Sequence, residues 1–262
     1  MFSQSFESMI NMVNIPPLVF FLLGSKDRRR NSNGKAFTKE FGSDINWYWI
    51  CPFGLLRFAN MFTGIVETQG IIKKVIEKGA NRTFWIKSPI SPKLKPDQSV
   101  AHDGACLTVE EVKGSQHRVT AIAETLSKTI LSDWQKGATI NLERCLKIND
   151  RLDGHFVQGH VDTSAICFDK KEKDGSWEFS FQFLSEFATL IIEKGSITIN
   201  GISLTIFNVT ETTFDVAIIP YTFEHTNMNL VKPGQKVNIE FDLLGKYINR
   251  KLLLLQNVIP SI

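Results

Sequence analysis

The residue types best suited to chemistry stand in two short segments that contain glycine. Cys106 follows Gly104 by two positions, and His160 directly follows Gly159. Histidine titrates close to neutral pH, so His160 is suited to carrying a proton. Cys106 could hydrogen-bond to a substrate, whereas nucleophilic attack would need an activated thiolate that the sequence does not demonstrate. Each residue also has a structural interpretation, because cysteine is often buried and glycine is common in simple turns.

These segments belong to a duplication that runs through most of the chain. The stretch His102–Val109 matches Ile199–Ile206, with residue numbers that differ by 97. Nearer the N-terminus of each repeat, Gly64–Glu67 matches Gly159–Asp162, with residue numbers that differ by 95. A period this long that occurs only twice indicates tandem domains and not a solenoid.

Composition and charge narrow the class of protein. The formal net charge is +3, and basic residues are interspersed with acidic ones. No basic stripe therefore argues for nucleic acid or an anionic membrane as a partner. Cys51, Cys106, Cys145 and Cys167 form no CxxC pair and no cluster with histidines. We interpret them as free thiols in a reducing cytosol, with neither a disulfide framework nor a metal site.

Residues 1–60 stand outside the duplication. Their apolar run Ile15–Leu23 contains two prolines and is shorter than the roughly 20 residues that span a bilayer. Its basic neighbours follow the run, whereas those of a signal peptide precede the apolar core. We expect a poorly ordered leader or a misassigned start, with Met61 as the functional beginning; a membrane anchor is the less favoured alternative.

Local patterns within each repeat indicate strands and turns. Apolar and polar residues alternate on both sides of Asn200–Gly201, which is a tight-turn signal, and Asp103–Gly104 supplies the same signal in the first repeat. Several short strands punctuated by turn residues predict a small closed barrel in each half. Helices are expected over residues 185–194 and 243–258. The second is amphipathic and is expected to pack on its own barrel or to mediate self-association.

Four ordered motifs together resemble riboflavin synthase, the lumazine-dismutating enzyme family, over Met61 to about Arg250. They are Met61–Glu67, Gly104–Val109, Gly154–Asp162 and Lys194–Thr205. The resemblance implies an all-β fold of two similar six-stranded Greek-key barrels, over residues 61–157 and 158–242, and a C-terminal helix over residues 243–262 that assembles a homotrimer. Active sites would then form between the first barrel of one subunit and the second barrel of its neighbour.

The family reaction makes a duplicated fold useful. Two molecules of 6,7-dimethyl-8-ribityllumazine react by four-carbon transfer, which gives riboflavin and 5-amino-6-ribitylaminouracil in the last step of riboflavin biosynthesis. The C7 methyl protons of the substrate are acidic because the carbanion is delocalised into the ring, so the resemblance implies neither a metal nor an organic cofactor. It further implies a cytoplasmic enzyme, with association with lumazine synthase as an additional possibility.

The resemblance also assigns site residues. Ser99, Cys106 and His160 are expected nearest the chemistry, since Cys106 corresponds to Ser203 and His160 to Ile65 where the repeats differ. Substrate contacts are expected from Phe62, Gly64, Ile65, Val66, Leu107, Thr108, Ala123, Glu124, Thr125, Gly159, Val161, Lys194, Ser203, Leu204, Thr205, Ile219, Pro220, Tyr221, Thr222, Phe223 and Glu224.

Several of these residues have competing interpretations. Phe62 would pack over the bound ring or plug the barrel, and Lys194 would contact substrate or end a helix. His155 would orient a neighbour or simply pack, whereas His102 is expected on the surface of a strand.

Two other classes of protein remain as alternatives. Lumazine-binding fluorescent antenna proteins share the duplicated fold without turnover, but they generally lack active-site matches in one barrel. A structural tandem barrel would leave the Gly-His and Cys-Leu-Thr motifs unexplained. The chain departs from the family at Asp153, where glycine is common, and at Phe223, where leucine is frequent.

Overall fold

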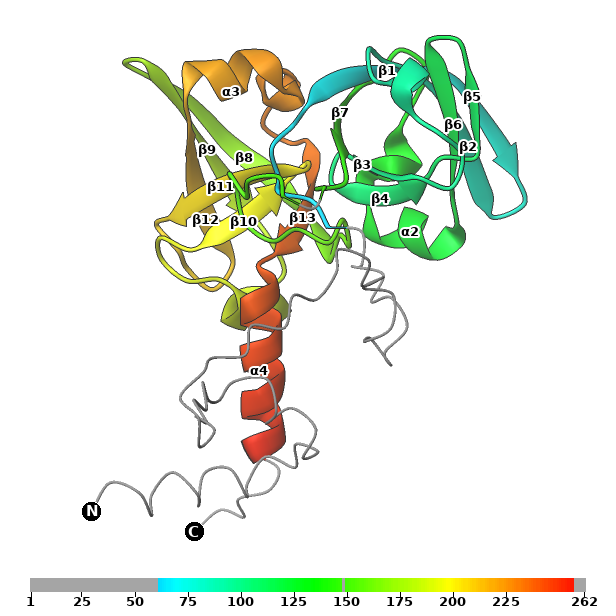
Figure 1. Ribbon diagram of the computed structural model, residues 1–262. Helices are drawn as coiled ribbons and strands as arrows, with labels where there is room; N and C mark the ends of the chain where they lie inside the picture. Colours follow the sequence, from blue (N-terminus) through cyan, green and yellow to red (C-terminus); the bar gives the residue numbers. More distant parts are fainter. Residues whose placement is uncertain (1–60, 148, 257–262) are drawn as a thin grey trace, which may run out of the picture. The chain divides into compact units, whose positions relative to one another are not determined.

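The computed structural model describes residues 61–147 and 149–256 (Figure 1). The expected leader, Cys51 and the end of the expected C-terminal helix lie outside these residues. The described part is mostly β-structure in two sheets, one from each half of the duplication. The predicted fold class is confirmed.

The first sheet is antiparallel and contains seven strands in the order β4-β3-β7-β1-β2-β6-β5. Its strands are β1 (Thr68–Lys78), β2 (Asn81–Lys87), β3 (Ser99–His102), β4 (Ala105–Thr108), β5 (Glu111–Lys113), β6 (Gln116–Ala121) and β7 (Thr139–Arg144). The long strand β1 pairs with β7 over Thr68–Ile71 and with β2 from Ile71 onward, and the β1–β2 ladder contains a bulge between Ile72 and Lys74. A strand shared in this way curls the sheet around its core, but the ladder does not close into a ring. The expectation of a closed six-stranded barrel in each half therefore holds for the second half and was wrong for the first, which is a curled seven-stranded sheet.

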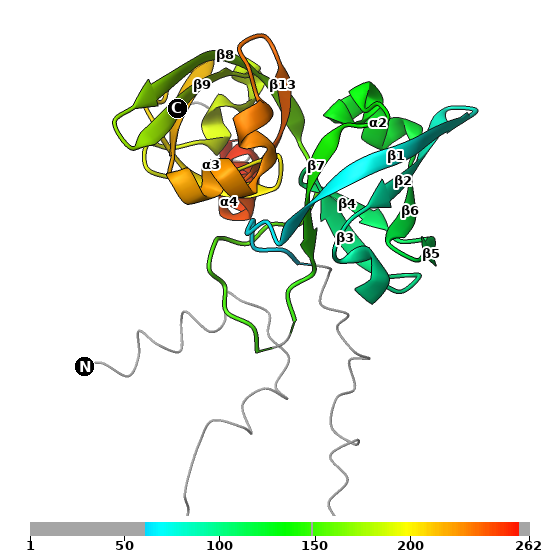
Figure 2. The same ribbon diagram turned by 90° about the horizontal axis from the view of Figure 1, so that it is seen from above.

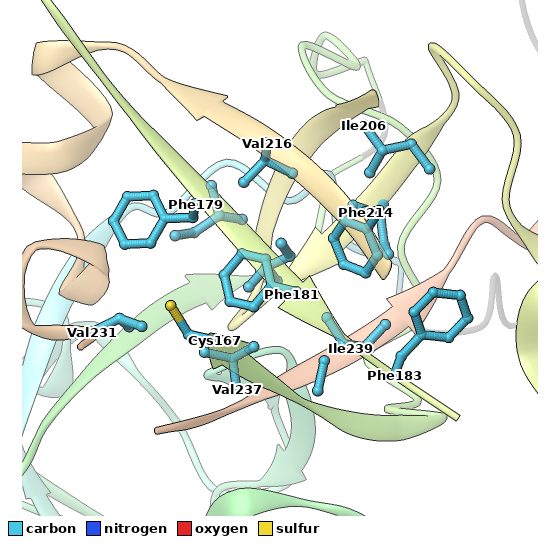
Figure 3. Close-up of a cluster of buried hydrophobic side chains, with 14 of the residues drawn as sticks. Cys167, Phe179, Phe181, Phe183, Ile206, Phe214, Val216, Val231, Val237 and Ile239 are labelled. Carbon is cyan, nitrogen blue, oxygen red and sulfur yellow. The ribbon is translucent and has the colours of Figure 1, made fainter. Parts of the chain in front are cut away.

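The second sheet is a closed six-stranded barrel in the order β10-β11-β12-β9-β8-β13 (Figure 2). Its strands are β8 (Thr163–Lys173), β9 (Ser176–Gln182), β10 (Ser196–Ile199), β11 (Ile202–Phe207), β12 (Thr213–Ile218) and β13 (Lys236–Phe241). Alternate residues of these strands point inward, as the period-two pattern predicted, and Phe179, Phe181 and Phe214 fill the interior around Cys167 (Figure 3). Burial of these large aromatic side chains contributes to the stability of the second barrel.

The two predicted tight turns are confirmed, and they meet each other. Asp103 and Asn200 both have a φ of 46°, and each is followed by a glycine with φ near 80°. A Cβ on Gly104 would lie 2.9 Å from the backbone nitrogen of Gly201. Only glycine permits both the left-handed backbone and this close approach.

Asparagine side chains join the two halves around these turns. Asn141 Nδ2 donates to the carbonyl of Asn200 at 2.9 Å, and Asn238 Nδ2 donates to the carbonyl of Asp103 at 2.8 Å. Asn141 and Asn238 are themselves matched residues of the repeats, so the contact is internally symmetric. These buried hydrogen bonds fix one half against the other.

Helices complete each half. They are α2 (Ala123–Lys128), α3 (Pro220–His225) and α4 (Leu243–Gln256). Sequence patterning missed α2 and α3, which are too short to show a helical period. The helix expected over residues 185–194 is a shorter 3-10 helix, Ser185–Leu190.

The C-terminal helix follows β13 directly (Figure 1), and many of its apolar side chains are exposed. Leu244, Tyr247, Ile248 and Leu255 are each more than half exposed. No helix within residues 61–147 and 149–256 combines the length and apolar character needed to span a bilayer.

Candidate functional site

Two short segments cross between the halves of the molecule. We call residues 62–67, which precede β1, the first entry segment, and residues 157–162, which precede β8, the second entry segment. The backbone N–H of Ser203 in the second barrel donates to the carbonyl of Gly64 at 2.8 Å. The N–H of Cys106 in the first sheet donates to the carbonyl of Gly159 at the same distance. The first entry segment therefore contacts the second barrel although it leads into the first half. The second entry segment contacts the first half although it leads into the second barrel.

Glycine is required at both crossing points. Gly64 and Gly159 have φ values of 76° and 77°, in the left-handed region. A Cβ on Gly64 would lie 2.7 Å from the Ser203 side chain, and one on Gly159 would lie 2.6 Å from that of Cys106. No other residue allows the entry segments to lie this close to the opposite half.

The second entry segment closes a cavity of about 650 Å³, which we call the Cys106 pocket. Its walls come from β4, α2, the second entry segment and the start of β8. The lining residues are Ala105, Cys106, Glu124, Thr125, Ser127, Lys128, Thr129, Gly159, His160, Val161, Asp162, Thr163, Ser164, Glu186 and Phe187.

The first entry segment closes a matching cavity of about 460 Å³, which we call the Ser203 pocket. Its lining residues are Gly64, Ile65, Val66, Glu67, Thr68, Gln69, Ile202, Ser203, Tyr221, Thr222, Glu224, His225 and Thr226. Every one of them has a counterpart in the Cys106 pocket at a difference of 95 or 97 in residue number. The two pockets are therefore two copies of one site.

Cys106 is held as a neutral thiol. Burial raises the pKa of Cys106, and a side-chain hydrogen bond with Ser99 opposes this only in part. Ser99 lies on β3, from which its carbonyl also accepts the thiol of Cys145 at 3.3 Å. A thiol in this setting can hydrogen-bond to a bound molecule but is a poor nucleophile.

The matched hydroxyl of Ser203 is oriented by a histidine. His155 Nδ1 lies 2.7 Å from Ser203 Oγ, and its Nε2 lies 3.2 Å from Thr198 Oγ1. Burial lowers the pKa of His155, so the neutral ring acts as a relay between the two hydroxyl groups. Of the two interpretations of His155, orientation of a neighbour fits this geometry.

Comparisons with known proteins agree with this paired architecture. The model of the lumazine binding domain matches residues 63–145 and again residues 158–242. The chain is 39% identical to the riboflavin synthase of Bacillus subtilis over 193 residues, which cover 73% of this chain and 90% of that protein. It is 38% identical to the riboflavin synthase of Escherichia coli, covering 70% and 87% of the two chains.

The chain belongs to the riboflavin synthase family.

Solved structures show the same fold at lower identity. The crystal structure of LumP with 6,7-dimethyl-8-(1'-D-ribityl) lumazine matches with a TM-score of 0.63 and 22% identity, over 68% of this chain and 98% of that one. LumP with riboflavin matches with a TM-score of 0.65 and 21% identity, over 69% and 98% of the chains. Riboflavin synthase relatives and this binding protein thus share one architecture.

The pockets bring together about half of the expected site residues. The Cys106 pocket contains Cys106, Glu124, Thr125, Gly159, His160 and Val161. The Ser203 pocket contains Gly64, Ile65, Val66, Ser203, Tyr221, Thr222 and Glu224. His160 in one pocket is replaced by Ile65 in the other, so only the Cys106 pocket has an imidazole from its entry segment.

Other expected site residues lie elsewhere. Phe62 is fully buried beneath Gly159 in a small cluster with Ala101 and Val157, outside the cores of both sheets. Phe223 stacks on Trp177 with ring centroids 3.7 Å apart. Neither pocket is lined by Ser99, Phe62, Leu107, Thr108, Ala123, Lys194, Leu204, Thr205, Ile219, Pro220 or Phe223. Lys194 is exposed and lies over the ring of Phe207.

Several polar residues of the Cys106 pocket were not among the expected site residues. They come from α2 and its C-cap, the end of the second entry segment, the start of β8 and the 3-10 helix, and they are Ser127, Lys128, Thr129, Asp162, Thr163, Ser164 and Glu186. The constant difference of 97 could have found Ser127, because its counterpart Glu224 was expected at the site.

The expectation that His102 lies on a surface was wrong. His102 is fully buried, and its Nε2 lies 2.9 Å from Nε2 of the equally buried His117. His117 Nδ1 in turn lies 2.8 Å from Ser91 Oγ. The first sheet thus contains a hydrogen-bonded row of polar side chains where the second barrel has Ile199 and Phe214. Two polar residues can replace apolar core residues when each satisfies the hydrogen-bonding groups of the other.

Proposed function

We propose that the chain catalyses the dismutation of 6,7-dimethyl-8-ribityllumazine, in which one molecule transfers four carbons to another to give riboflavin and 5-amino-6-ribitylaminouracil. The observation that supports it most directly is the pair of matched pockets on one chain. Donor and acceptor are the same compound, so two copies of one site suit them. The pockets differ at Cys106 against Ser203 and at His160 against Ile65, and a donor and an acceptor need different proton transfers.

The residues would act by holding the ring and moving protons. His160 stands at the open side of the Cys106 pocket, where an imidazole can take or return a proton at the acidic C7 methyl group. The neutral thiol of Cys106, backed by Ser99, would hydrogen-bond to the heterocycle. Ser203, oriented by His155, would do the same in the other pocket. Proximity and orientation of two bound molecules would supply much of the rate enhancement.

Assembly would bring a Cys106 pocket to face a Ser203 pocket. We propose that α4 forms a homotrimer through its exposed apolar residues, so that the first barrel of one copy meets the second barrel of a neighbour. Each site would then hold two lumazine molecules. We place the enzyme in the cytoplasm, where association with lumazine synthase would deliver its substrate.

The test mixes the full chain with 6,7-dimethyl-8-ribityllumazine alone and follows the lumazine and riboflavin absorbance bands. We expect one riboflavin for every two lumazines consumed. A chain that binds lumazine tightly, stays monomeric and forms no riboflavin would instead be an antenna-type binding protein, the second candidate that the likeness to LumP suggests.

A further inference from the structure

Each entry segment is held by a buried glutamate at the same position of its own half. Glu143 on β7 and Glu240 on β13 are matched residues of the repeats, and they are only 7% and 3% exposed. A carboxylate is costly to bury unless donors surround it. Neither glutamate lines the Cys106 pocket or the Ser203 pocket.

Both carboxylate oxygens of Glu143 accept hydrogen bonds from the first entry segment. Its Oε1 accepts from the backbone N–H of Thr63 at 2.7 Å and from the Thr63 hydroxyl at 2.8 Å. Its Oε2 accepts from the N–H of Gly64 at 3.0 Å. Gly64 is the residue whose carbonyl accepts from Ser203, so Glu143 stands directly behind the Ser203 pocket.

Glu240 makes fewer hydrogen bonds to the second entry segment. Its Oε1 accepts from the N–H of Gln158 at 2.7 Å. Among the described residues no donor has hydrogen-bond geometry to its buried Oε2, although the backbone N–H of Gly159 is close enough to the carboxyl group to lower its pKa. The next residue, Gly159, accepts from Cys106 and precedes His160, so Glu240 stands behind the Cys106 pocket.

We propose that Glu143 and Glu240 are positioning residues, each holding an entry segment so that its residues reach the pocket of the opposite half. The proposal rests on the proposed function, since it assigns the arrangement of the same two pockets. Under this proposal, the Ser203 pocket of the second barrel depends on Glu143 of the first half, and the Cys106 pocket of the first half depends on Glu240 of the second barrel. The two glutamates hold their segments unequally, because Glu143 accepts three hydrogen bonds within 3.0 Å, whereas Glu240 accepts one at 2.7 Å and only a weaker interaction from Gly159.

This inequality gives the two glutamates opposite responses to glutamine. Glutamine has one acceptor oxygen and an NH2 group that only donates. In Glu143→Gln, the NH2 group must face an N–H of Thr63 or Gly64, which removes an acceptor from a charge-assisted hydrogen bond. In Glu240→Gln, the oxygen can still accept from Gln158, and the NH2 group replaces Oε2, which gives up only the weaker attraction to the N–H of Gly159.

The experiment measures amide hydrogen exchange across both entry segments of the full chain above pH 8, where the Glu143 carboxyl group, with its pKa raised to about 7, is ionised; it requires no ligand. We expect Glu143→Gln to speed exchange at residues 63–65 by about ten- to a hundredfold, the loss typical of a hydrogen bond to a charged group. Glu240→Gln should change exchange at residues 158–160 by less than about threefold, whereas Glu240→Ala should resemble Glu143→Gln. Glu77→Gln, at a side chain that is 74% exposed, is the matched control and should change neither segment.

Turnover and lumazine binding by the same variants separate positioning from chemistry. Rescue of kcat/KM in Glu240→Gln relative to Glu240→Ala supports positioning. An equal loss of kcat/KM in Glu240→Gln and Glu240→Ala, while the second entry segment stays protected from exchange, would show that Glu240 acts through its charge. That result would overturn the proposal for Glu240. Unchanged exchange in Glu143→Gln would overturn it for Glu143, and this contrast stands even if Glu240→Ala fails to fold. Wild-type chain that binds lumazine without turnover would refute the proposed function alone, because the exchange results judge positioning independently.

Discussion

The buried histidine pair should make the first sheet sensitive to acid while the second barrel is not. Burial lowers the pKa of His117 from 6.5 to about 4. Burial, and then the neighbouring His117, hold the pKa of His102 well below 6.5. The matched positions in the second barrel are occupied by Ile199 and Phe214, which do not titrate.

The direction of the pH effect on stability depends on whether the folded or the unfolded chain binds the proton more readily. The unfolded chain protonates as pH falls through 6.5, whereas the folded chain keeps His117 neutral until about pH 4. Stability is therefore complete above pH 6.5 and is lost as pH falls toward 4. At about 1.4 kcal/mol per pKa unit, His117 alone costs about 2 kcal/mol between pH 7.5 and 5.

Two carboxyl groups act in the opposite direction. Burial raises the pKa of Asp103 and of Glu143 to about 7. Their folded forms bind protons at higher pH than their unfolded forms, which adds stability as pH falls below 7. The total pH dependence of the wild-type chain therefore hides the histidine effect, and only a difference between two proteins reveals it.

The double variant His102→Ile with His117→Phe supplies that difference, because it copies the second barrel. Ser91 Oγ keeps a partner after the substitution, since it lies 2.8 Å from Ser88 Oγ. The assay is amide hydrogen exchange at pH 7.5 and pH 5, read in β2, which pairs with β6, and in the matched strand β9.

We expect the variant-to-wild-type protection ratio in β2 to rise at least about thirtyfold between pH 7.5 and 5, because His117 alone corresponds to about 2 kcal/mol and His102 adds to it in the same direction. The ratio in β9 should stay constant. A rise below about threefold in β2, or an equal rise in β9, would refute the reasoning.

Three further predictions concern the site, the helix and the turns. His160→Gln should lower the single-turnover rate with lumazine by at least about a hundredfold, whereas Cys106→Ser, which keeps a hydrogen-bonding group, should cost less than about tenfold; equal losses would contradict the separate roles. If the chain forms the proposed trimer, removal of residues 243–262 should convert it to a monomer in analytical ultracentrifugation, and an unchanged mass would exclude α4 as the assembly element. Gly104→Ala should lower the free energy of unfolding by about 3 kcal/mol, because the new Cβ meets the opposing turn as well as the left-handed backbone. Gly79→Ala, with φ of 60° and open space around it, should cost only about 1 kcal/mol, so similar urea midpoints would refute this account.

Patterns that are local along the chain could be predicted without the structure. Turn residues at Asp103–Gly104 and Asn200–Gly201 set the backbone by their own preferences, and alternation placed the strands on either side of them. The C-terminal helix was predicted from its apolar spacing, and it is confirmed over Leu243–Gln256. The short helices α2 and α3 were missed because six residues span less than two helical turns.

The duplication, the turn chemistry and the ordered motifs were determined by the sequence alone, because each depends on residue types at fixed separations. Only the tertiary structure decided which pocket each entry segment lines. Hydrogen bonds such as that from Ser203 to Gly64 join residues far apart in the chain, and no local pattern encodes them. It likewise decided that His102 is buried, because an imidazole enters a core only where a partner such as His117 satisfies it.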